Sequence, residues 1–134
     1  MTLRRKSREF ALQMLFEWDM ARQKPARVEQ LFWKSARAAD STRKFANELF
    51  EGAVAESDSS DKLVEKLSKN WRLDRLATVD RNILRLAIYE IRSGTSPPKV
   101  VINEALELAK KFSSAEAPAF LNGILDAAFQ KFEG

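Results

Sequence analysis

Apolar residues recur at helical spacing along almost the whole chain, and their densest run lies between residues 78 and 94. The apolar members of this run are Val79, Ile83, Leu84, Leu86, Ala87, Ile88 and Ile91. They surround most of the girth of a helix, so other helices must cover it on nearly every side. Arg92 complements the helix dipole, and Gly94 tolerates a positive φ where the helix ends. The run predicts the central helix of an all-α bundle.

The remaining apolar residues predict six further amphipathic helices around the central one. These helices are expected over about 4–21, from 25 into the thirties, after a turn at 40–42, over 63–71, from the prolines at 97 and 98 to 112, and from about 116 onward. The polar run at 56–61 is interpreted as a loop. It divides one domain, residues 1–134, into helical halves of about 1–57 and 58–134. The fold class is therefore an all-α bundle of seven helices in two subdomains.

Several single positions carry their own expectations. Ser96 is a candidate N-cap for the sixth helix. Gly123 is expected inside the last helix, where it would let another helix approach closely. Glu90 falls on the core side and needs a buried donor, so a structural role is favoured over catalysis. Glu107 and Lys111 have the spacing of a helical ion pair.

The composition excludes most catalytic chemistry. The chain has 134 residues, 45% of them apolar, with no cysteine and no histidine. Disulfides, thiol nucleophiles, histidine-dependent triads and nearly all zinc or haem sites are therefore excluded. We expect no catalytic residue, no metal and no cofactor. The sequence also lacks a secretory signal and an apolar run of membrane-spanning length, which favours a soluble cytoplasmic protein.

The excess positive charge lies in one short segment at the start of the chain. The net charge is +4, and Arg4, Arg5, Lys6 and Arg8 account for all of it. Such an arm either meets a polyanion or simply keeps the terminus solvated. Phe16 lies off the apolar stripe of the first helix. It is either a second core contact or a ring held near the basic end on which a base stacks.

Four motifs together resemble the NusB family of transcription antitermination proteins. They read RRKSRE at 4–9 with ALQ at 11–13, VDRNILRLAIYE at 79–90, VINEALELAK at 101–110, and FLNGILD at 120–126. The resemblance implies a non-enzymatic, RNA-binding helical domain. It implies binding to the boxA element of nascent ribosomal RNA together with the ribosomal protein NusE. It also implies a complex with RNA polymerase and other Nus factors.

The resemblance assigns roles to particular positions of this chain. The RNA contacts would be Arg4, Arg5, Lys6, Arg8, Phe16 and Phe120. Asp80 and Arg85 would face NusE, and Glu116 would be an acid that moderates RNA binding at the edge of the site. Ala119 stands where the family often has a lysine, so this edge has one cation fewer. Two other functions stay open: the RNA-binding module of an RNA methyltransferase, and a homodimeric protein-interaction domain.

Overall fold

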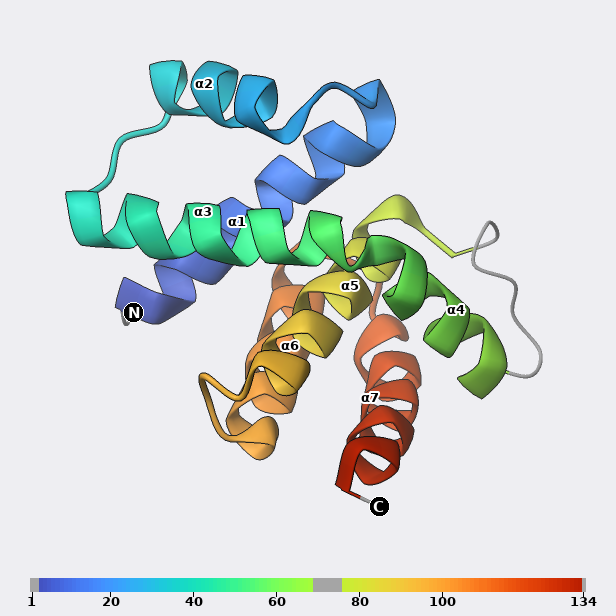
Figure 1. Ribbon diagram of the computed structural model, residues 1–134. Coiled ribbons are helices and arrows are strands. Elements are labelled where there is room, and N and C mark those ends of the chain that lie inside the picture. The colour runs from blue at the N-terminus through green and yellow to red at the C-terminus, as the bar shows by residue number, and fades with distance from the viewer. Residues whose placement is uncertain (1–2, 69–75, 134) are drawn as a thin grey trace.

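The computed structural model describes residues 3–68 and 76–133, and within these ranges every regular element is an α-helix (Figure 1). The helices are α1 (Leu3–Ala21), α2 (Pro25–Ser35), α3 (Asp40–Ala55), α4 (Ser57–Leu67), α5 (Thr78–Ser93), α6 (Pro98–Phe112) and α7 (Ala117–Glu133). The predicted seven-helix all-α class is confirmed. No helix in the described part of the chain has both the length and the apolar character needed to cross a bilayer.

Helix α5 is the centre of the bundle, as its apolar girth predicted. It packs against α1, α3, α4, α6 and α7, and every side chain from residue 82 to 88 is buried. Gly94 follows the helix with φ of 70°, in the left-handed region that glycine adopts without strain. Both the position and the end of the central helix are therefore confirmed.

The other helices pack on opposite sides of α5. Helix α1 lies against α3, and α2 covers both, while α6 and α7 pack together on the other side (Figure 1). Gly52 of α3 faces the Tyr89 ring of α5, and a Cβ at this glycine would overlap that ring. Glycine is therefore required here for the close approach of the two helices. The division into halves near residue 57 remains a prediction.

Two predicted boundaries were wrong. Residues 40–42 form the first turn of α3 rather than a preceding turn, and Thr42 is buried there. The polar run was predicted as a loop, but α4 begins at Ser57, directly after Glu56. The hydroxyl of Ser57 donates to the Val54 carbonyl at 2.8 Å, so the serine satisfies the backbone where one helix turns into the next.

Two predicted roles of single residues were also wrong. Ser96 is not the cap of α6, because Pro97 occupies the N-cap position and Pro98 the first turn. Gly123 lies inside α7 as predicted, yet no atom beyond the neighbouring backbone of its own helix lies within 4 Å of where its Cβ would be. It therefore makes no close helix contact. The last part of the expected fourth helix, from residue 69 to Trp71, lies outside the described residues.

Candidate nucleic-acid interface

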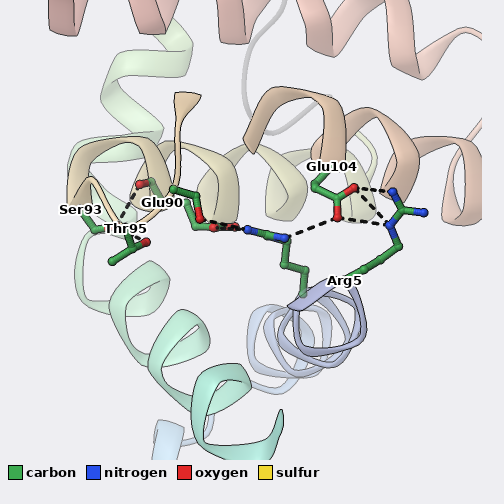
Figure 2. Close-up of polar contacts among 7 residues, drawn as sticks. Arg5, Glu90, Ser93, Thr95 and Glu104 are labelled. Atoms are coloured by element: carbon green, nitrogen blue, oxygen red, sulfur yellow. Dashed lines mark hydrogen bonds and ion pairs between the residues drawn. The ribbon is translucent and has the colours of Figure 1, made fainter. Parts of the chain in front are cut away.

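The four cations at the start of α1 differ in the groups that they contact. Arg5 reaches Glu104 of α6 (Figure 2), and Arg8 contacts the same carboxylate. Arg5 Nη2 lies 2.8 Å from Glu104 Oε2, and its side chain is 40% exposed. Hydrogen bonding to Glu104 raises the pKa of the Arg5 guanidinium. Arg5 is therefore at the surface but already has an anionic partner.

Arg8 is buried and bonded on several sides. Its side chain is only 4% exposed, and that of its partner Glu90 is 1% exposed. The guanidinium makes two parallel hydrogen bonds to the Glu90 carboxylate, at 2.8 Å and 2.9 Å. The predicted buried donor for Glu90 is thus Arg8, which joins α1 to α5. The structure encloses this predicted RNA contact within the fold.

Arg4 and Lys6 are exposed, and both contact aromatic rings instead of acids. The Arg4 guanidinium lies 4.7 Å from the centre of the Phe45 ring of α3. Lys6 Nζ lies 4.9 Å from the Phe10 ring. Neither residue forms an ion pair with any residue in the described ranges. These two cations keep their charge available to an external anion.

Phe16 is not a core residue, so the first of its two interpretations was wrong. The ring is 39% exposed and lines a hollow of about 310 Å³ between α1, α5 and α6. The other lining residues are Leu12, Gln13, Glu17, Val79 and Phe112. Phe16 is also not close to the basic end, since twelve residues of helix separate it from Arg4 by about 18 Å.

Phe120 lines a second hollow of about 190 Å³ at the start of α7. Its other walls are Leu76, Ala77, Asp80, Ser114, Glu116 and Ala117. Glu116 is exposed on the rim, so its charge lies beside the ring. Asp80 accepts a hydrogen bond from the Ser113 hydroxyl at 2.5 Å, which ties the end of α6 to the start of α5.

The two hollows lie on either side of the start of α5 and the end of α6. Val79 and Phe112 belong to the first hollow, whereas Asp80 and Ser114 belong to the second. Each hollow presents one phenylalanine ring. The fold therefore brings Phe16 and Phe120, which are 104 residues apart in sequence, to the same end of the central helix.

A third hollow, of about 160 Å³, follows α1 toward its basic end. It is lined by Arg5, Arg8, Glu9, Glu104, Glu107, Leu108 and Lys111. Three cations and three acids cancel in formal charge. The predicted pairing of Lys111 was wrong: its ammonium bonds Glu9 of α1 at 2.9 Å, whereas Glu107 pairs with Lys110. Helical spacing alone could not reveal the Glu9 contact, because the partner lies on another helix.

Arg85, predicted to face NusE, is buried in a charge network below the surface. It makes two hydrogen bonds of 2.8 Å to Asp61 and lies 3.0 Å from Asp19. Burial alone would lower the pKa of Arg85, but hydrogen bonds and charge from Asp61 and Asp19 outweigh it and raise the pKa. In this arrangement Arg85 supports the helices, and Asp80 remains the residue at the edge of a hollow.

Comparisons with known proteins agree with the motifs. A family model described as the NusB family matches residues 5–130. The chain is 48% identical to the transcription antitermination protein NusB of Koribacter versatilis, over 97% of this chain and 90% of the relative. It is 44% identical to that of Myxococcus xanthus, over 94% of each. These names confirm the predicted non-enzymatic factor class.

Solved structures show the same fold. The chain superposes on NusB of T. maritima with a TM-score of 0.84 and 30% identity, covering 98% of this chain and 97% of the other. A structure of antitermination factors NusB and NusE in complex with double-stranded RNA matches with a TM-score of 0.84 and 28% identity. There the match covers 96% of this chain and 97% of the other.

Proposed function

Since the chain belongs to the NusB family, we propose that it binds boxA RNA of nascent ribosomal transcripts together with NusE and acts in transcription antitermination. The similar structure of NusB and NusE in complex with double-stranded RNA supports these two partners. The observation that carries the proposal is the placement of Phe16 and Phe120 in adjacent hollows. Partially exposed rings of this kind are surfaces on which unpaired bases stack.

The four cations of the arm take different roles in this proposal. Arg4 and Lys6 contact phosphates, because they are exposed and lack an acidic partner within the described residues. Arg5 contributes only when it leaves Glu104. Arg8 positions α1 against α5 and makes no RNA contact. The arm therefore supplies two available phosphate contacts rather than four.

The partner surface begins at the second hollow. Asp80 lies at its wall and is the residue that we assign to NusE, while Arg85 holds α5 and α4 in place beneath it. Glu116 on the rim repels phosphate and so moderates binding at the Phe120 ring. RNA polymerase and other Nus factors would join through the assembled complex rather than through the RNA hollows.

The central test is RNA binding by Phe120→Ala, with Phe132→Ala as a matched control on the same helix. Phe132 is exposed at the far end of α7 and lines neither hollow. Binding of a boxA RNA and of a scrambled RNA is measured by titration, with and without NusE, over a salt series. Phe120→Ala should weaken boxA binding by about 1–3 kcal/mol even at high salt, because loss of stacking is not screened.

Phe132→Ala should bind as the unchanged protein does. Equal binding of boxA and scrambled RNA by the unchanged protein, with NusE present, would contradict the proposed function. Normal boxA binding by Phe120→Ala would remove that ring from the interface while leaving the function intact.

A further inference from the structure

A second cationic surface follows the connection from α2 to α3 and continues to the start of α1. Segment 33–45 holds four cations, Lys34, Arg37, Arg43 and Lys44, and one acid, Asp40. All four cations are exposed. Helices α1, α2 and α3 pack against one another, and the starts of α1 and α3 lie at the same end of the molecule (Figure 1). Arg4 and Lys6 therefore join the four to form what we call the cationic end.

Aromatic rings hold part of the cationic end in place. The Arg43 guanidinium lies 5.1 Å from the Trp33 ring centre, and Arg4 lies over Phe45. Both rings are half-buried. The Trp33 indole nitrogen donates to Asn47 at 2.8 Å, which fixes the ring. A guanidinium resting on a fixed ring loses less conformational freedom on binding than one extended into water.

The charges of the cationic end are not neutralised from within. Among residues 3–68 and 76–133, no ion pair includes any of its six cations, although ion pairs occur throughout the rest of this region. Arg5, the neighbour of two of them, is paired with Glu104. A surface kept only for solubility mixes charges of both signs. Six cations accompanied by one acid form a field of one sign, which is the electrostatic footprint of a polyanion site.

We propose that the cationic end binds the phosphate backbone of RNA that flanks the segment held at the Phe16 and Phe120 hollows. The inference rests on the proposed function and extends it to the α2–α3 connection. Nucleic acid fits better than an acidic protein partner, because RNA bases also stack on guanidinium planes such as that of Arg43. Protein interfaces instead exclude lysine from their cores.

The test compares two RNAs and two triple variants. One RNA contains boxA alone, and the other carries flanks of about 10 nucleotides on both sides, within the site sizes of single-strand binders. The variant is Arg37→Ala, Arg43→Ala and Lys44→Ala in one chain. The control is Lys62→Ala, Lys66→Ala and Lys131→Ala, three exposed cations on α4 and α7. Each of the two triple variants removes three positive charges.

We expect the variant to bind boxA RNA normally and the extended RNA more weakly. The log-log salt slope for the extended RNA should fall by roughly 2, since each phosphate contact to a single strand contributes about 0.7. The control triple should leave the slope for both RNAs unchanged. A double variant, Arg37→Ala with Lys44→Ala, keeps Arg43 over Trp33 and should lower the slope by about 1.4. Circular dichroism checks that each variant is folded.

Three results would overturn the inference. An unchanged slope for the extended RNA would remove the cationic end from RNA binding. An equal loss with both RNAs would show that the surface does not act on the flanks. Loss of NusE binding without RNA would assign the surface to a protein. If the unchanged chain bound neither RNA, with or without NusE, the proposed function itself would fail.

Discussion

The cations at the start of α1 form two groups, one paired with glutamates and one lying over aromatic rings, and the two groups present different electrostatic surfaces. Arg5 is bonded to Glu104 of α6 and Arg8 to Glu90 of α5, and Lys111 of α6 bonds back to Glu9 of α1. Arg4 and Lys6 instead lie over aromatic rings and have no acidic partner among the described residues. Neighbours in sequence such as Arg4 and Arg5 therefore differ in what they offer to an anion.

The two groups of cations differ because different groups from the neighbouring helices lie opposite each side chain. Successive residues of a helix point about 100° apart, so Arg4 and Arg5 face different neighbours. Helix α6 offers Glu104, whereas α3 offers the Phe45 ring. An ion pair cancels most of the field of a cation at a distance, but an aromatic ring does not. The basic arm therefore carries less available charge than its sequence indicates.

The largest expected effect comes from removing Arg8. Arg8→Ala leaves Glu90 and its 1% exposed carboxylate without its charged donor. Breaking a buried ion pair at one partner costs about 3–5 kcal/mol. Urea denaturation should show this loss in the free energy of unfolding. Lys6→Ala removes an exposed cation. It is the control and should change stability by less than about 0.5 kcal/mol. A similar small change for Arg8→Ala would show that the buried pair is not structural.

The fold was largely predictable because its helices bury broad apolar faces. The period of the run at 79–91 determined both the central helix and its buried faces. The start of α4 was missed because serine and aspartate favour loops when they are exposed. Here Asp61 bonds Arg85 from α5, and Ser60 is fully buried. Tertiary contacts of this kind override local propensity, and a single sequence does not reveal them.

The candidate site was only partly predictable, because the packing of the helices decides which side chains are exposed to RNA. Phe16 was found from its position off the apolar stripe, yet its hollow is completed by Val79 and Phe112 from two other helices. Glu90 was correctly expected to need a buried donor. That the donor is Arg8, which was predicted to bind RNA, depends on how α1 crosses α5. Charge counts along a sequence carry no information about such crossings.

Helices α2 and α3 hold a pair of neighbouring acids, Glu29 and Glu51, and this pair makes stability depend on pH. Burial, and then the nearby Glu51, raise the pKa of Glu29 to about 8 from 4.5. The folded protein thus holds a proton that the unfolded chain releases, so this contribution to stability is lost as pH rises from about 4.5 to 8. Glu29→Gln removes this dependence.

Relative to the unchanged protein, Glu29→Gln should be more stable at pH 8.5 than at pH 5 by roughly 1–2 kcal/mol. This is well below the full value of about 1.4 kcal/mol per pKa unit, because the carboxyl is only partly buried and solvent screens it. Urea denaturation at both values measures the difference. Glu48→Gln, an exposed acid on α3, is the control. If the two variants responded alike to pH, the Glu29 proton would not be linked to folding.

Removing Arg4 and Lys6, the two unpaired cations among the described residues of the arm, should weaken RNA binding more than removing Arg5, which is paired with Glu104. Arg4→Ala with Lys6→Ala should lower the log-log salt slope by about 1.4, which is roughly a sevenfold change between 50 and 200 mM salt. Arg5→Ala should lower the slope by clearly less than about 0.7, because Glu104 already neutralises Arg5. Binding isotherms across the salt series measure both. Equal slopes per cation removed would mean that the Glu104 pair opens freely when RNA binds.

The smallest expected effect comes from removing the negative charge that is paired with Arg5. Glu104→Gln keeps a hydrogen-bond acceptor for Arg5 and Arg8 but removes the charge that neutralises Arg5. Arg8 retains Glu90, so the fold should be maintained. The salt slope should rise by about 0.7, a change of roughly 2.5-fold between 50 and 200 mM salt. Glu107→Gln, on the same helix and paired with Lys110, should leave the slope unchanged. If Glu104→Gln also left the salt slope unchanged, RNA would pass too far from Arg5 to sense its charge. Within the arm, phosphate contacts would then be confined to Arg4 and Lys6.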